Sequence, residues 1–223
     1  MKKSAILFGI NDYHGSPLKN AANDAEALSK KLAELGFETK CFLDVDSETM
    51  NRELVAFKSD LAQSSVGLFF FAGHGIQCKG ENYLATKSTS FFDESSCKYT
   101  AIALNMVIDI FEESKVNTKI IILDACRDNP FVTWRSAAND GLAPVYAPKG
   151  TIIAFSTSPG QKASDGLNDH GVYTNALLTH IATKNLSIED MFKRVRNTVS
   201  SHTGHKQITW EHTSLMGTFY FNS

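Results

Sequence analysis

Apolar residues along the chain occur in short continuous runs that are separated by segments with helical periodicity. The runs predict strands, because uninterrupted apolar stretches of this length are typical of strands buried on both faces of a sheet. We expect such strands at residues 4–10, 66–71, 119–123 and 151–155. Segments 37–43 and 217–221 also resemble strands, and a short strand is expected at 83–85. The periodic segments predict helices at 20–35, 105–114, 172–182 and 187–200, and one more that has Ser47 as its N-cap. Three remaining stretches are expected to be irregular, namely 86–99, 127–149 and 159–171.

The alternation of strands and helices determines the expected fold class. Strands that are joined through helices pair in parallel, and right-handed crossovers then place helices on both faces of the sheet. The pattern runs from residue 4 to residue 221 without a repeat, a low-complexity tract or a linker. We therefore predict an α/β fold with three layers, α-β-α, in a single domain over residues 1–223.

The composition is that of an ordinary globular protein, with 43% hydrophobic and 21% charged residues in a chain of 223. A net charge of −2 gives no electrostatic reason to expect binding to nucleic acid. No apolar stretch approaches the roughly 18 residues of a membrane span, and the apolar run after Met1-Lys-Lys-Ser is too short for a signal peptide. We expect a cytoplasmic protein that does not contact a membrane.

The cysteines and histidines do not form a metal-binding pattern. The four cysteines show no CxxC spacing, which in a cytoplasmic protein predicts reduced thiols. His202 and His205 are three residues apart but lack Cys or carboxylate partners, so they indicate a solvated loop. We expect neither a metal ion nor another cofactor.

Two of the apolar runs end in residues that carry chemistry. His74 follows the strand 66–71 between two glycines, and Cys126 follows the strand 119–123. Functional groups of parallel sheets gather at the carboxyl ends of strands, so neighbouring strands would bring this imidazole to this thiol. A thiol with a pKa of about 8.5 needs a nearby base to react at neutral pH. The main-chain N–H groups of Gly75 and Cys126 are candidates for an oxyanion hole.

Each of these two residues also has a simpler interpretation. A cysteine at a strand end is usually a small buried hydrophobe, and a histidine between glycines is often a turn residue. Their joint placement at the ends of two strongly apolar strands favours a cysteine peptidase.

Several segments spread over the whole chain resemble one known family. They are Ala5-Ile-Leu-Phe-Gly-Ile-Asn-Asp-Tyr13, Leu18-Lys-Asn-Ala-Ala-Asn-Asp-Ala25, Phe71-Ala-Gly-His-Gly75, Leu123-Asp-Ala-Cys-Arg-Asp-Asn-Pro130, Lys149-Gly-Thr-Ile-Ile-Ala-Phe-Ser156, Asp165-Gly166, Tyr173-Thr-Asn-Ala-Leu177 and Ser214-Leu-Met-Gly-Thr-Phe-Tyr220. In this order they resemble the caspase-like cysteine peptidases of family C14, in particular the bacterial caspase homologues (orthocaspases) and the metacaspases. The 52 residues from His74 to Cys126 also fit the spacing of about 50 in caspases. The resemblance implies the caspase fold, with a six-stranded, mostly parallel sheet and a dyad of His74 and Cys126.

Two carboxylates indicate the kind of substrate. Asp124 lies two residues before Cys126, and Asp24 lies near the start of the first predicted helix. A carboxylate beside a catalytic thiol disfavours the thiolate unless a cation arrives, and a substrate arginine or lysine would supply that charge. In metacaspases the matching acidic residues line the P1 pocket, so the resemblance implies cleavage after Arg or Lys. The simpler interpretations are a helix-terminus carboxylate for Asp24 and, for Asp124, a strand-end carboxylate bonded to a main-chain N–H.

The sequence also departs from the family. Metacaspases often bind calcium after the catalytic histidine, but here that stretch offers Asp93 and Glu94, too few carboxylates for such a site. The sequence therefore does not favour calcium dependence. From this sequence we expect no sensor module, so that regulation would come from a partner protein or from processing, or be absent.

Self-processing has one candidate position in the aperiodic loop 127–149. Cleavage after Arg135, which small residues follow, would separate a large segment of about residues 1–135 from a small one of about 136–223. In the alternative interpretation Trp134 packs the loop down and Arg135 is a surface charge.

Ser156, Thr157 and Ser158 follow the strand 151–155, where an extended peptide would add main-chain hydrogen bonds. The same residues are equally typical of a turn. We expect an endopeptidase acting on proteins or peptides with Arg or Lys at P1, in a bacterial stress, cell-death or defence circuit. One alternative is a catalytically weak caspase-like module that binds proteins. Another, a flavodoxin-like nucleotide or phosphate binder, lacks the GxGxxG and Walker sequences it would need.

Overall fold

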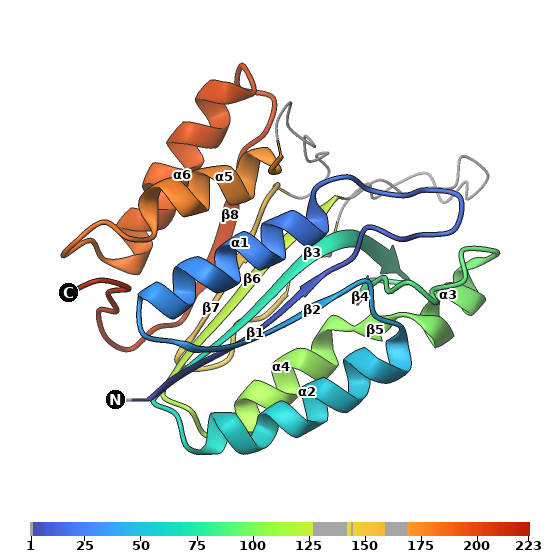
Figure 1. Cartoon of the computed structure of the whole chain (residues 1–223), viewed down its shortest axis with the longest axis horizontal. Coiled ribbons are helices and arrows are strands. Elements are labelled where there is room, and N and C mark those ends of the chain that lie inside the picture. Colours follow the sequence, from blue (N-terminus) through green and yellow to red (C-terminus); the bar gives the residue numbers. More distant parts are fainter. Residues whose placement is uncertain (1, 127–141, 144, 159–168) are drawn as a thin grey trace.

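The computed structural model describes residues 2–126, 142–143, 145–158 and 169–223, and of Cys126 only the main chain. Within these residues a mixed sheet forms the middle layer of the molecule (Figure 1). Its principal strands lie in the order β2 (Glu38–Leu43), β1 (Lys3–Gly9), β3 (Val66–Cys78), β6 (Thr118–Cys126), β7 (Thr151–Phe155) and β8 (Trp210–Thr213). Neighbouring strands are parallel except for β7 and β8, which run antiparallel. The predicted mostly parallel sheet is confirmed.

Two short strands extend the sheet beside the carboxyl end of β3. β4 (Glu81–Leu84) pairs antiparallel with β3, and β5 (Ile102–Ala103) pairs with β4. The strand was predicted to end at residue 71, but β3 continues to Cys78, because its last residues pair with β4 after its first residues have paired with β6. It is parallel to β6 up to His74 and antiparallel to β4 from Gly75 onward.

Helices cover both faces of the sheet, which confirms the predicted three-layer fold. α1 (Ala21–Glu34), α5 (Val172–His180) and α6 (Ile188–His202) lie over one face, and α2 (Ser47–Ala62) and α4 (Leu104–Glu113) lie over the other (Figure 1). α3 (Glu94–Thr100) lies at the end of the sheet where β3 and β4 pair. No helix in the described part of the chain is both long and apolar enough to cross a membrane.

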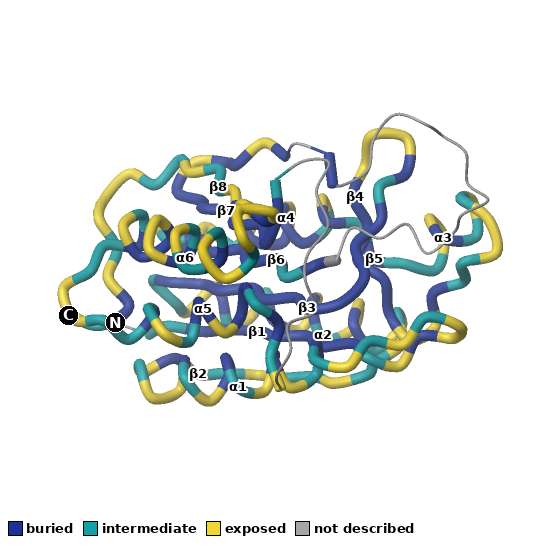
Figure 2. The backbone as a smooth tube through the Cα atoms, turned by 90° about the horizontal axis from the view of Figure 1, so that it is seen from above, coloured by how far each residue is buried: buried dark blue, intermediate teal, exposed yellow. Residues whose placement is uncertain are grey.

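Successive residues of the central strands face opposite helix layers, as the two-residue period of a strand requires. In β1, Ile6 and Phe8 belong to the core under α2 and α4, whereas Ala5 and Leu7 belong to the core under α1, α5 and α6. The neighbouring strands β3, β6 and β7 alternate in the same way. Because both faces are covered, most residues of these four central strands are buried (Figure 2), and their sequences contain continuous apolar runs.

Two helix starts differ from the prediction. The N-cap of α2 is Asp46 rather than Ser47, since the Asp46 carboxylate accepts a hydrogen bond from the N–H of Thr49 at 2.8 Å. The stretch 86–99, expected to be irregular, contains most of α3, whose N-cap Asp93 accepts from the N–H of Ser96 at 2.6 Å. Aspartate and serine are nearly equivalent N-caps, so composition alone did not decide between Asp46 and Ser47.

The last strand of the sheet was predicted at the wrong place. β8 is the half-exposed segment Trp210–Thr213, whereas 217–221 forms no strand and contributes a single bridge between Tyr220 and Ser187. Phe219 and Phe221 pack instead on the core under α1, α5 and α6, with ring centroids 5.0 Å apart. The aromatic residues at 217–221 therefore arise from packing against the helix layer and not from pairing in the sheet.

Candidate active site

His74 and Cys126 occupy facing positions in two neighbouring parallel strands. The register of β3 and β6 pairs Ala72 with Asp124, Gly73 with Ala125 and His74 with Cys126. Neighbouring strands of a sheet lie about 4.8 Å apart. The fold thus brings together the two residues that the sequence placed 52 positions apart.

The His74 side chain is held in a pocket of aromatic rings and is only 3% exposed. Its ring centroid lies 4.5 Å from that of Tyr13 and 6.2 Å from that of Phe91. Nε2 lies 2.9 Å from the carbonyl oxygen of Ser16. Because a carbonyl oxygen only accepts hydrogen bonds, Nε2 carries the proton, and Nδ1 is the nitrogen that can take up another.

Gly73 permits this arrangement. The Tyr13 hydroxyl accepts a hydrogen bond from the main-chain N–H of His74 at 3.0 Å and lies where a side chain at position 73 would begin. Any Cβ at position 73 would collide with that hydroxyl and with the ring of Phe71. Neither Tyr13 nor Ser16 was predicted as a site residue, although Tyr13 lies in one of the family-like segments.

The carboxylates of Asp24 and Asp124 both lie close to Gly171 at the start of α5. A Cβ on Gly171 would lie 3.1 Å from Oδ2 of Asp24 and 3.4 Å from Oδ2 of Asp124. The N–H of Gly171, the N-cap of α5, lies 3.2 Å from each carboxylate oxygen of Asp24. The Thr174 hydroxyl donates to Oδ2 of Asp124 at 2.7 Å. The N-terminus of α5 therefore stabilises two neighbouring negative charges.

Two further residues of this region were missed by the sequence analysis. His170 Nδ1 lies 2.9 Å from Oδ1 of Asp24. Tyr173 is buried, and burial together with the charge of Asp124 raises the pKa of Tyr173 well above its usual value. Tyr173 and Thr174 belong to a family-like segment, but His170 carried no signal in the sequence beyond its place in a loop.

The segment proposed to bind extended peptides continues directly from β7. The N–H of Ser156 donates to the carbonyl of Leu123 at 2.9 Å, and the Ser156 carbonyl accepts from the Gln207 side chain at 2.8 Å. The Thr157 side chain is buried, and the Ser158 hydroxyl donates to the carbonyl of Ile208 at 2.9 Å. Both main-chain groups of Ser156 are therefore already engaged in hydrogen bonds within the protein.

The remaining predicted residues are placed as follows. Gly75 pairs with Leu84 at the start of the antiparallel part of β3. Asp93 is used as the N-cap of α3, and its bond to the N–H of Ser96 lowers the pKa of its carboxyl. Arg135, the candidate for self-cleavage, lies outside the described residues, so processing there stays a prediction.

Three other cysteines have properties unlike those of a nucleophile. Burial raises the pKa of Cys41 to about 11, that of Cys78 to about 11 and that of Cys97 to about 12. At neutral pH these thiols are protonated, and a protonated thiol is a poor nucleophile.

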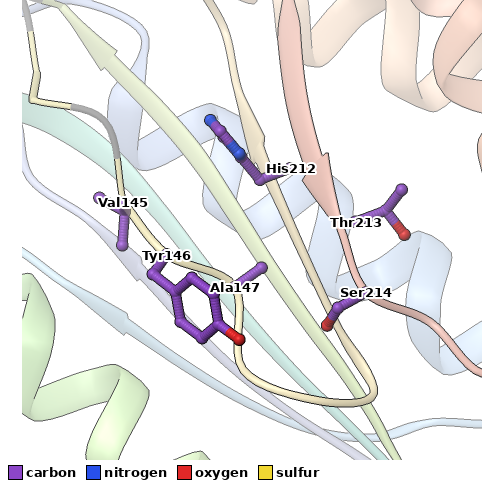
Figure 3. Close-up of a pocket in the computed structure, with 6 residues that line it drawn as sticks. All are labelled: Val145, Tyr146, Ala147, His212, Thr213 and Ser214. Atoms are coloured by element: carbon purple, nitrogen blue, oxygen red, sulfur yellow. The ribbon is translucent and has the colours of Figure 1, made fainter.

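A surface pocket of about 410 Å³ lies beside the edge strand β8 (Figure 3). Its lining combines the segment 145–147 with His212, Thr213 and Ser214. Two strands, β6 and β7, separate β8 from β3, so this pocket is distinct from the surroundings of His74. The six lining residues include neither a cysteine nor a carboxylate, and they do not form a second candidate active site.

Relatives with curated names resemble this chain over part of their length. The human mucosa-associated lymphoid tissue lymphoma translocation protein 1 is 24% identical over 166 residues, which cover 72% of this chain and 19% of that protein. A probable protease of a Desulfuromonadales bacterium is 27% identical over 119 residues, which cover 49% of this chain and 14% of the relative. This chain thus spans less than a fifth of the length of either relative.

Solved caspase structures share the fold. The Drosophila initiator caspase Dronc superposes with a TM-score of 0.74 at 15% identity, over 99% of this chain and 83% of that one. Caspase-1 from Spodoptera frugiperda gives a TM-score of 0.73 at 19% identity, over 99% of this chain and 92% of its own. A family model for the caspase domain matches residues 2–220. Since that match covers almost the whole chain, the protein belongs to the caspase domain family, the cysteine-type peptidases of family C14.

Proposed function

We propose that the protein is a cysteine endopeptidase that hydrolyses peptide bonds after arginine, and also after lysine. Cys126 is the nucleophile and His74 is its base. The observation that carries the proposal is the register of β3 and β6, which pairs His74 with Cys126. Membership of the caspase domain family supports protein substrates and peptidase chemistry.

In the proposed reaction His74 takes the thiol proton of Cys126 at Nδ1. The Ser16 carbonyl supports this step, because it fixes the other ring proton on Nε2 and stabilises the imidazolium that results. The thiolate attacks the carbonyl carbon of the scissile bond, and the oxyanion accepts hydrogen bonds from the N–H groups of Gly75 and Cys126. His74 then returns the proton to the leaving amine. Water, deprotonated by His74, hydrolyses the thioester and regenerates the thiol.

The preference for a basic P1 residue rests on Asp24 and Asp124. Two carboxylates bordering one point repel each other, and a cation placed between them relieves that repulsion. A guanidinium presents parallel N–H donors that match carboxylate oxygens, so arginine is the better partner and lysine the weaker one. An aspartate side chain would add a third negative charge and is excluded.

The test uses three fluorogenic peptides that differ only in the P1 residue, which is Arg, Lys or Asp. We expect hydrolysis of the Arg peptide, slower hydrolysis of the Lys peptide and none of the Asp peptide. A protein that binds these peptides without cleaving any would be a caspase-like binding module, and the proposal would be wrong. Participation in a stress, cell-death or defence circuit is part of the proposal and rests on the family resemblance alone.

A further inference from the structure

A short segment in front of α5 lies against the start of α1. The Asn23 side chain donates to the carbonyl of Asp169 at 3.4 Å. At the next two positions, His170 and Gly171 both bond to the carboxylate of Asp24. Three consecutive residues are therefore held to α1, and two of them contact the carboxylate proposed to recognise the substrate.

The contact between His170 and Asp24 is a hydrogen bond between the imidazole and the carboxylate. Nδ1 lies 2.9 Å from Oδ1, and since a carboxylate only accepts, the imidazole donates the N–H. The Asp24 side chain is 5% exposed, whereas the His170 side chain keeps 29% of its surface exposed. Asp24 is thus covered, and the group that bonds to it is the one that reaches solvent.

We propose that His170 holds the place of the substrate's P1 cation in the free protein, and that an incoming P1 side chain displaces it from Asp24. This inference rests on the proposed function, because it assumes that Asp24 binds a basic P1 residue. Displacement is local, since the N–H of Gly171 bonds to both oxygens of Asp24 and keeps the carboxylate in place when the imidazole leaves. His170 therefore competes with the P1 side chain for Asp24.

The effect of His170 on KM and kcat distinguishes a competing role from a structural one. A group that must leave before substrate binds raises KM and leaves kcat unchanged, because it does not contact the reacting atoms. Its removal should lower KM for Arg and Lys peptides by the same factor. We expect about a tenfold decrease for His170→Ala, which is the scale of one hydrogen bond to a charged group.

Two additional variants control the experiment. His170→Gln replaces the imidazole with an amide that keeps an N–H donor, so its KM should lie between those of wild type and His170→Ala. His180→Ala removes a histidine at the other end of α5, where Nε2 lies 2.8 Å from the Thr198 hydroxyl and does not contact Asp24. That variant should leave KM at the wild-type value and reports any general effect of losing a histidine from this region.

A second readout does not depend on catalysis. Agmatine carries the guanidinium of arginine, and its Kd is measured by titration calorimetry with wild type, His170→Ala and His180→Ala. We expect about tenfold tighter binding to His170→Ala alone. Equal binding to all three would show that His170 does not compete, and a higher KM in His170→Ala with a lower melting temperature would show that it supports the site. Either result would overturn the inference. If agmatine binds to none of them and no Arg peptide is cut, the proposed function itself is wrong.

Discussion

The hydroxyl of Tyr13 accepts a hydrogen bond from the main-chain N–H of His74 at 3.0 Å. The same hydroxyl donates to the carbonyl of Ala85 at 3.1 Å, and the N–H of Ala85 donates to the carbonyl of His74 at 3.0 Å. These three bonds close a ring that fixes the main chain at the point where β3 changes its partner. The position of the proposed base therefore depends on a side chain 61 residues earlier.

Tyr13→Phe should reduce kcat for an Arg peptide while the protein still folds. The variant leaves the N–H of His74 and a carbonyl buried with one partner fewer, which costs about 1–3 kcal/mol of unfolding free energy. The matched control is Tyr83→Phe, because the Tyr83 hydroxyl bonds to the Glu81 side chain at 2.6 Å and not to His74. Denaturant titration and steady-state kinetics measure the two effects. Wild-type kcat in Tyr13→Phe would contradict a positioning role.

Thiol labelling should identify one fast-reacting cysteine. With pKa values of about 11 or 12, Cys41, Cys78 and Cys97 have on the order of one thiolate per thousand thiols, or fewer, at pH 8. Iodoacetamide should therefore modify Cys126 first, and the three others only as the pH approaches their raised pKa values. Peptide mass spectrometry over time follows each site. A fast phase that persists in Cys126→Ala would assign the reactive thiol elsewhere.

Asp24→Asn and Asp124→Asn should each weaken hydrolysis of Arg peptides. Removing one charged partner of a buried pair costs about 2–5 kcal/mol of binding, so kcat/KM should decrease by more than tenfold. Asp190→Asn is the control with the same change in net charge, since Asp190 lies at the exposed start of α6 and pairs with Lys193. If all three variants cleave the Arg peptide equally well, the two carboxylates do not select the substrate.

Self-processing after Arg135 should leave a C-terminal piece that begins at Ser136. Intact mass is recorded during incubation of wild type, Cys126→Ala and Arg135→Ala, and only wild type is expected to be cut. The two variants distinguish the chain's own activity from that of a contaminating protease, because cleavage of Cys126→Ala requires another enzyme. A wild-type chain that stays intact and cleaves Arg peptides at full rate would show that processing is not needed.

The central strands could be predicted because strands buried on both faces have continuous apolar sequences. The segment 151–155 was predicted with the bounds it has in the structure, and His74 was placed correctly relative to Cys126 along neighbouring strands. A half-exposed edge strand does not need such a run. β8, an edge strand with the sequence Trp-Glu-His-Thr, was missed for that reason.

The site was only partly predictable for a different reason. Asp24 and Asp124 were predicted because they lie beside a helix start and beside the proposed nucleophile Cys126. Their approach to Gly171, and the bond from His170, depend on how α5 packs against α1, and no local pattern encodes that contact. Tyr13 was missed in the same way, because its partner His74 is distant in sequence.

The most direct test of the account is hydrolysis of a fluorogenic Arg peptide by wild type, Cys126→Ala and His74→Ala, with thermal melting of all three. Thermal melting shows whether each variant folds, and only a folded variant tests the assignment. We predict hydrolysis by wild type and a decrease of at least a thousandfold in each variant, as expected when a nucleophile or its base is lost. Activity near the wild-type value in either folded variant would contradict the assignment of His74 and Cys126 as the catalytic pair.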